Sequence, residues 1–183
     1  MKTVAILGAN KNSIYKQLQN VEVYDECRDL RNYDGPWPVV AHPPCRGYSA
    51  FMRHWAKPKP GEKGLALFCI QRIKDYGGVL EHPAHSRLFT EVLGIRPGQP
   101  DGTFQCVEIN QSWFGYPTKK RTWLLMPKNY VLPQMPFILE ASGGITESSS
   151  DRRIFENMSQ SQRSRTTKSL AKYLLKIVRL NNG

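Results

Sequence analysis

Short apolar runs alternate with amphipathic and polar stretches along this chain. Six stretches of apolar or alternating residues are predicted strands: 3–8, 21–24, 39–41, 79–80, 104–110 and 122–126. Three stretches with helical periodicity or capping residues are predicted helices: 12–18, 61–76 and 159–180. A strand, a helix and then another strand form a βαβ unit, which builds parallel sheets. We therefore expect an α/β fold with a mostly parallel sheet and a C-terminal helix.

One domain accounts for the whole chain. Its 183 residues suit a single hydrophobic core, and no internal repeat or second-domain boundary interrupts residues 1–183. Glycines and a triple serine predict a mobile loop over residues 142–158.

The chain is organised around the stretch 38–49. The apolar run Val39-Val40-Ala41 predicts a buried strand, and two prolines stop its pairing just before Cys45. Ligands bind at the carboxyl ends of strands in an open parallel sheet, so a thiol there is placed for chemistry. A neighbouring Arg46 or a protonated His42 would favour the reactive thiolate. The alternative is a buried cysteine that only packs at a strand end.

A second candidate group follows the strand at 79–80. Glu81 ends this strand, so we expect it at the same edge of the sheet as Cys45. A glutamate in a central strand, with no Lys or Arg nearby in the sequence, is costly to bury without a role. The alternative is that Glu81 caps the following turn at 84–87.

The net charge is +11, which concentrates polyanions near the surface. Nucleic acid is the most common polyanion, and this charge argues against a protein that mimics DNA. The alternative is that the basic residues only maintain solubility. Basic and aromatic residues mix at 50–63 and again at 111–121, where a hairpin-like connection would present Lys119, Lys120 and Arg121 to an anion.

The sequence lacks features of membrane-bound and secreted proteins, which bears on where the protein is expected to be found. It has no run of eighteen apolar residues and no signal-peptide pattern, so we expect no membrane partner. Its cysteines, at 27, 45, 69 and 106, form no CxxC pair, which is typical of reduced thiols in a cytoplasm.

Three motifs resemble those of DNA cytosine-5 methyltransferases, in the family's order. Residues 43–49, Pro-Pro-Cys-Arg-Gly-Tyr-Ser, resemble the family's Pro-Pro-Cys-Gln-Gly-Phe-Ser. Glu81-His82-Pro83 resembles Glu-Asn-Val or Glu-Asn-Pro, and residues 114–121 are similar to Tyr-Gly-Val-Pro-Gln-Lys-Arg. The chain is still more similar to small phage-encoded relatives of these enzymes, which carry Ala-His-Pro-Pro-Cys and Gly-Gly-Val-Leu-Glu-His-Pro. The resemblance covers residues 36–126.

This resemblance implies a Rossmann-like, methyltransferase-like domain that modifies a pyrimidine base of DNA or of a nucleotide. It assigns Cys45 as the nucleophile on carbon 6 of a flipped cytosine, and Glu81 as the group that binds or protonates the base. Substrate contacts are expected from His42, Pro44, Ser49, His82, Lys119, Lys120 and Arg121. S-adenosylmethionine would be held by Gly8 and Asp25. If the protein is phage-encoded, the compartment is the host cytoplasm.

The sequence also departs from the family pattern. Residues 7–12 hold one glycine where the family has Phe-x-Gly-x-Gly, and the chain has no room for a target-recognition domain. Thr118, Lys120 and Thr122 replace the family's Gln-x-Arg-x-Arg. Two alternatives therefore stay open beside a reduced DNA cytosine-5 methyltransferase. One is a reaction on a nucleobase without S-adenosylmethionine, such as base exchange or base removal; the other is a non-catalytic DNA-binding protein.

A zinc site is a further alternative. His42 and Cys45, together with His82 and His85, supply four ligand types at adjacent strand ends. Two prolines split the first pair, and the methyltransferase resemblance already accounts for this region, so we expect no metal. The sequence does not specify the base, the choice between DNA and free nucleotide, or the oligomeric state.

Overall fold

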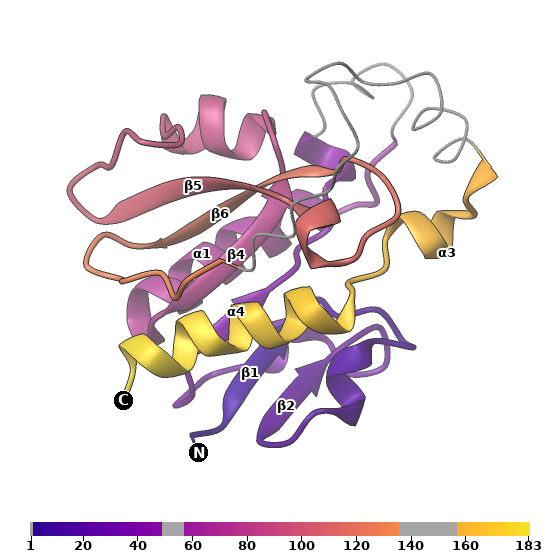
Figure 1. Cartoon of the computed structure of the whole chain (residues 1–183), viewed down its shortest axis with the longest axis horizontal. Helices are drawn as coiled ribbons and strands as arrows, with labels where there is room; N and C mark the ends of the chain where they lie inside the picture. Colours follow the sequence, from indigo (N-terminus) through magenta and orange to yellow (C-terminus); the bar gives the residue numbers. More distant parts are fainter. Residues whose placement is uncertain (1, 49–56, 136–156) are drawn as a thin grey trace.

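The computed structural model describes residues 2–48, 57–135 and 157–183, and its centre is a six-stranded sheet (Figure 1). The strands are β1 (Val4–Leu7), β2 (Val21–Tyr24), β3 (Val39–Ala41), β4 (Gly78–Pro83), β5 (Phe104–Asn110) and β6 (Arg121–Pro127). Their order across the sheet is β2-β1-β3-β4-β6-β5. The expected α/β fold with a C-terminal helix is confirmed.

The described helices are mostly short, apart from one on each face of the sheet. The α-helices are α1 (Glu62–Tyr76), α3 (Gln160–Arg163) and α4 (Lys168–Asn181). The 3₁₀ turns are η1 (Ile14–Gln17), η2 (Leu30–Asn32), η3 (Arg46–Tyr48) and η5 (Gln111–Phe114), and η4 (Leu88–Leu93) is a π-helical turn. The predicted single helix over 159–180 is wrong. Ser159 and Gln162 form the expected capping box of α3, but a new cap at Thr167 starts α4.

The sheet is mixed, which corrects the expectation of a mostly parallel sheet. Strands β2, β1, β3 and β4 run parallel, whereas β6 is antiparallel to both β4 and β5. Only residues 111–120 connect β5 to β6, and a parallel pair needs a crossover of a dozen or more residues. The short connection therefore forces a hairpin, and β6 inserts between β4 and β5.

Alternation along the strands divides the core into two layers (Figure 1). One layer packs under α1 and contains Ala5, Leu7, Ala41, Leu80, Ala66, Cys69 and Ile73. The other packs under α4 and contains Val4, Ile6, Val40, Val79, Leu124, Leu170, Leu174 and Ile177. Within the described residues, no helix is both long and apolar enough to cross a bilayer.

The same alternation selects the residues that face the α4 side at the carboxyl edge of the parallel strands. His42 follows the α4-facing Val40 by two residues, and Glu81 follows Val79 by two. On β6, Thr122 precedes the α4-facing Leu124 by two residues. Three neighbouring strands thus bring polar side chains to one face and one edge.

Candidate functional site

Glu81 lies at the centre of a network of buried polar groups. Its Oε2 is 3.0 Å from Nδ1 of His42, and its Oε1 accepts a 2.9 Å hydrogen bond from Nε2 of Gln111. The Glu81 side chain is 14% exposed and that of His42 is 12% exposed, so both groups are mostly screened from water. The expectation that Glu81 might only cap the turn at 84–87 is not supported by these contacts.

Tyr15 extends this network behind His42. It projects from η1, is fully buried, and places its hydroxyl 3.0 Å from Nε2 of His42. Burial and the charge of Glu81 raise the pKa of Tyr15 well above its ordinary value, so the phenol keeps its proton. Because Nδ1 of His42 faces a carboxylate, that nitrogen carries a hydrogen and donates it. Tyr15, His42 and Glu81 therefore form one hydrogen-bonded chain.

Gln111 fixes the other carboxylate oxygen. It is 1% exposed, and its Nε2 donates to Glu81 and also to Oγ1 of Thr122 at 2.9 Å. Both partners accept a hydrogen bond, so the amide nitrogen faces them and its orientation is defined. Glu81 is thus held from both sides.

These partners keep Glu81 ionised. Burial alone would raise the pKa of Glu81, but the hydrogen bond from His42 and the nearby charges of His42 and Lys120 lower it well below its ordinary value. A carboxylate has about four acceptor positions, and the described contacts of Glu81 use two. Glu81 is therefore suited to accept hydrogen bonds from a ligand.

Cys45 lies near this carboxylate, in the corner that follows β3. The residue reaches the surface, yet desolvation of the thiol and the charge of Glu81 raise its pKa, while Lys120 lowers it. The expected help from Arg46 is wrong, because its guanidinium pairs with Glu62 at 3.1 Å. His42 is also engaged, with Glu81 and Tyr15. The resting form is accordingly the thiol.

Lys120 is the cation that both groups share. Its charge lowers the pKa of Cys45 and that of Glu81. Its Nζ lies 4.9 Å from the centre of the Tyr116 ring and donates to the Arg163 carbonyl at 3.0 Å. Lys120 thus joins the site on the α4 side.

The other two residues of the expected basic triplet lie apart from Lys120. Arg121 points to the opposite face of β6, where it makes two hydrogen bonds to Glu108 at 2.8 and 2.9 Å. Lys119 is exposed on the connecting loop. Because side chains alternate along a strand, the triplet forms no single anion site.

His82 is not placed for substrate contact at the Glu81 face. It is fully buried on the α1 side, and its ring centroid is 6.3 Å from that of Tyr48 and 6.2 Å from that of Phe89. Burial lowers the pKa of His82 to about 4, although Glu81 and the Pro44 carbonyl oppose the shift. Pro44 is half-buried in the corner before Cys45, and Ser49 lies outside the described residues.

The four side chains considered for a zinc site, those of His42, Cys45, His82 and His85, do not lie close enough together to share a metal ion. His42 binds Tyr15 and Glu81, His82 is buried on the other face, and His85 packs on Trp123 with ring centroids 5.1 Å apart. Across residues 2–48, 57–135 and 157–183, no group of three or more His, Cys, Asp or Glu side chains could hold a metal ion.

Gly8 and Asp25 do lie side by side at the ends of β1 and β2, but they do not fit S-adenosylmethionine. An added Cβ at Gly8 would come within 2.5 Å of the His42 carbonyl oxygen, so this glycine serves the close approach of β3. Asp25 pairs with Lys16 at 2.5 Å and accepts hydrogen bonds from the backbone N–H groups of Cys27 and Arg28. These three contacts leave the acid expected to bind a ribose only about one of its four acceptor positions.

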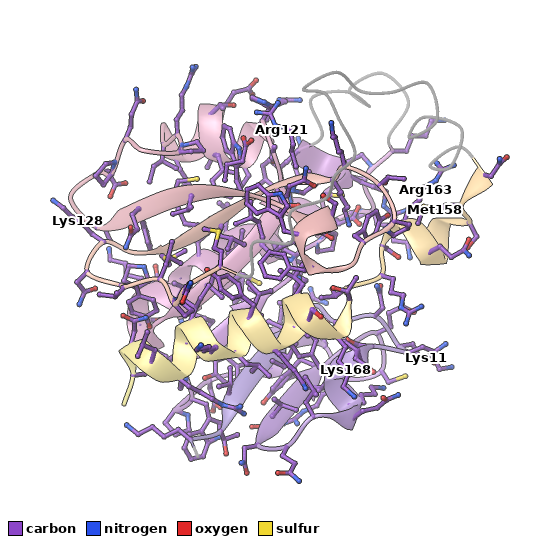
Figure 2. The ribbon with its side chains drawn as sticks, viewed as in Figure 1. Lys11, Arg121, Lys128, Met158, Arg163 and Lys168 are labelled. Carbon is purple, nitrogen blue, oxygen red and sulfur yellow. The ribbon has the colours of Figure 1, made fainter. Side chains whose placement is uncertain are left out.

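Basic residues gather in the loops at the carboxyl edge of the parallel strands. Asn10 donates to the Ser164 carbonyl at 3.1 Å, and Lys120 donates to that of Arg163, so three loops meet here. Residues 8–13, 111–120 and 157–168 contain no Asp or Glu. Their basic residues are Lys11, Lys119, Lys120, Arg163, Arg165 and Lys168. Figure 2 shows Lys11, Arg163 and Lys168 on the same side of the molecule.

The sequence analysis did not assign Tyr15, Gln111 or Thr122 to the site. Tyr15 lies in a predicted helix, Gln111 in a predicted connection and Thr122 in a predicted strand, and only the register of the sheet brings the three together. No protein-family model matches this chain, and no curated protein is detectably similar to it.

Proposed function

We propose that the protein modifies a pyrimidine base of DNA or of a nucleotide, with Cys45 as the nucleophile and Glu81 as the group that holds the base. The observation that carries this proposal is the convergence of three groups at one sheet edge. The charge of Glu81 acts on the Cys45 thiol, and the Lys120 ammonium acts on both. A thiol, a fixed carboxylate and a cation are the parts that covalent attack on a polarised ring requires.

Glu81 acts as a hydrogen-bond acceptor in this scheme. The amino group at carbon 4 of cytosine donates to such a carboxylate, whereas uracil presents a carbonyl at the same position. Tyr15 and His42 hold one oxygen and Gln111 holds the other. The carboxylate therefore need not reorganise when a base arrives, which favours cytosine.

Cys45 supplies the covalent step. Its proton leaves to solvent, and the thiolate adds to carbon 6 of the ring. The electron pair of the carbon 5–carbon 6 bond moves to carbon 5, which takes a proton from solvent. Loss of the original hydrogen from carbon 5 then expels the thiolate. The net result is hydrogen exchange at carbon 5, with no oxidant or reductant, and Lys120 favours the thiolate that starts it.

Methyl transfer is the reaction that the methyltransferase resemblance implies, and S-adenosylmethionine would supply the methyl group. Gly8 and Asp25 do not offer this cofactor a fitting donor set, because Lys16 and two backbone N–H groups engage Asp25. We therefore derive no step through it. This observation favours the second candidate, a modification of the base without S-adenosylmethionine.

Hydrogen exchange in D₂O tests the proposal without any cofactor. The protein is incubated with deoxycytidine monophosphate or with a cytosine-containing oligodeoxynucleotide, and deuterium at carbon 5 is measured by mass spectrometry. We expect exchange with the native chain and a loss of about 100-fold or more in Cys45→Ser and Glu81→Gln. Cys27→Ser, at another exposed cysteine, is the matched control.

Two results would contradict the proposal. One is exchange that persists in Cys45→Ser at the native rate. The other is the absence of exchange with either substrate while the native chain and Cys45→Ser bind the oligonucleotide equally, which is the outcome for a non-catalytic DNA-binding protein.

A further inference from the structure

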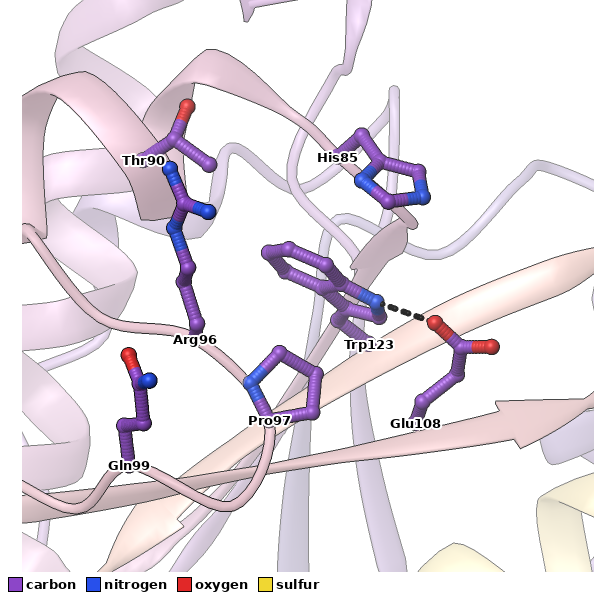
Figure 3. A pocket seen from close by; sticks show the side chains of 7 residues that line it. All are labelled: His85, Thr90, Arg96, Pro97, Gln99, Glu108 and Trp123. Carbon is purple, nitrogen blue, oxygen red and sulfur yellow. Dashed lines mark hydrogen bonds between the residues drawn. The ribbon is translucent and has the colours of Figure 1, made fainter.

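A pocket opens at the same edge of the sheet, on the face opposite Glu81 (Figure 3). It lies among the turn after β4, η4, the turn at 96–99 and the strands β5 and β6. Its volume is about 350 Å³. Small-ligand sites measure about 300–1,000 Å³, so this pocket has room for one small ligand.

One side of the pocket is a rigid apolar wall. Trp123 is 3% exposed, and its indole N–H donates to Oε2 of Glu108 at 2.8 Å, so its polar atom is satisfied within the protein. The saturated ring of Pro97 lies beside Trp123 and adds apolar surface (Figure 3). Such rings suit contact with the edge or face of a planar heterocycle.

His85 is held against this wall by an unusual backbone. Its φ is +59°, in the left-handed region that residues other than glycine rarely adopt, at a cost of about 1–2 kcal/mol. This conformation places the imidazole on Trp123, with ring centroids 5.1 Å apart. Backbone strain of this kind concentrates at ligand sites.

The opposite side of the pocket carries one positive charge that has no partner among the described residues. The carboxylate in the lining, Glu108, is neutralised by Arg121 through bonds of 2.8 and 2.9 Å. Arg96 makes no side-chain hydrogen bond or ion pair within the described residues, and the amide of Gln99 beside it makes none either. Figure 3 shows Arg96 and Thr90 side by side, across the pocket from His85.

We infer that this pocket binds one nucleotide, with the base against Trp123 and Pro97 and the phosphate at Arg96. The apolar wall fits a flat ring, the guanidinium fits an anion, and Gln99 supplies both a donor and an acceptor for a base edge. The volume of about 350 Å³ has room for about one such unit.

The position of the pocket gives this nucleotide a role, and that role rests on the proposed function. His85 follows Glu81 by four residues, so their Cα atoms are at most about 14 Å apart. A DNA strand whose target base reaches Glu81 would bring a neighbouring nucleotide to this pocket. The pocket would then select the sequence beside the target base.

Titrations followed by ¹⁵N–¹H NMR test the inference. Each of the four deoxynucleoside monophosphates, inorganic phosphate and a short single-stranded oligodeoxynucleotide is added to the ¹⁵N-labelled full chain. We expect a nucleotide to shift the Trp123 indole resonance, which Trp123→Phe identifies. Arg96→Gln should weaken this binding about 5- to 10-fold. Arg31→Gln removes the same charge near the β2 edge, far from the pocket in the sheet order, and should leave binding unchanged.

The outcomes separate this inference from the proposed function. It is overturned if no nucleotide shifts Trp123, if Arg96→Gln binds as the native chain does, or if inorganic phosphate binds as well as the nucleotides. Tighter binding of the oligonucleotide than of the monophosphates indicates that the natural ligand is a nucleotide within a DNA strand. Equal binding indicates a free nucleotide. Binding that persists in Cys45→Ser supports the pocket even if carbon 5 exchange is never observed.

Discussion

Replacing Glu81 by Gln should make the free energy of unfolding depend less on pH in acid. The pKa of Glu81 is lowered from an ordinary value of 4.5 to about 2 in the folded chain, because the hydrogen bond from His42 and nearby positive charges outweigh burial. A carboxyl group shifted in this way contributes about 3 kcal/mol to the free energy of unfolding at neutral pH. The side chain is only 14% exposed, so solvent screening discounts this value little.

The direction of the pH dependence follows from proton uptake. Below about pH 4.5 the unfolded chain binds a proton at Glu81 before the folded chain does, so acid favours unfolding. About 2 kcal/mol of the contribution is lost by pH 3, and the rest is lost as the pH falls through 2. Glu81→Gln has no such proton to bind. The difference in unfolding free energy between the native chain and this variant should therefore shrink by about 2 kcal/mol between pH 6 and pH 3.

Urea unfolding followed by circular dichroism at pH 6, 5, 4 and 3 measures this difference. Glu91→Gln is the matched control, because Glu91 is exposed on η4 and its pair with Arg87 is open to solvent. Its profile should stay parallel to that of the native chain. Parallel profiles for the native chain and Glu81→Gln would refute the reasoning, since Glu81 would then not be held as a carboxylate by its partners.

Three further predictions address the groups around Glu81. Tyr15→Phe should lower the free energy of unfolding by about 1–3 kcal/mol in urea melts, because Nε2 of His42 loses its buried partner. The alkylation of Cys45 by iodoacetamide at pH 7.5 can be followed by mass spectrometry. It should be faster in Glu81→Gln and slower in Lys120→Met, because Glu81 raises and Lys120 lowers the pKa of the thiol. The opposite order would contradict the placement of both charges near Cys45. Gly8→Ala should destabilise the fold by at least about 1–2 kcal/mol in thermal melts, because φ is +77° and the new Cβ would meet a carbonyl at 2.5 Å.

The sequence predicted where the key groups lie better than what they contact. The buried run 39–41 and the prolines after it placed Cys45 at a strand end, and the strand before Glu81 placed the carboxylate at the same edge. These features depend only on residues adjacent in the sequence, so they can be predicted from it. The partners of Glu81 are His42 and Gln111, and Tyr15 bonds His42 in turn; only the strand order brings these residues together.

Three expectations were wrong because they were based on neighbours in the sequence, whereas pairing and packing in the sheet decide the contacts. The hairpin between β5 and β6 was recognisable from its short connection, but its insertion beside β4 was not, and so the sheet was expected to be mostly parallel. Grouping Lys119, Lys120 and Arg121 into one patch ignored the alternation that begins where β6 starts, at Arg121. Arg46 was assigned to Cys45 by adjacency, whereas Glu62 on α1 captures it.

The network around Glu81 links η1, β3, β4 and η5, so it exists only when the whole sheet is assembled. Any compound that binds there must therefore stabilise the entire chain. At a concentration of 100 times its dissociation constant it adds about 2.7 kcal/mol to the free energy of unfolding, and the melting temperature rises accordingly. A thermal-shift screen of free bases, nucleosides and nucleotides can consequently rank candidate substrates before any turnover is detected.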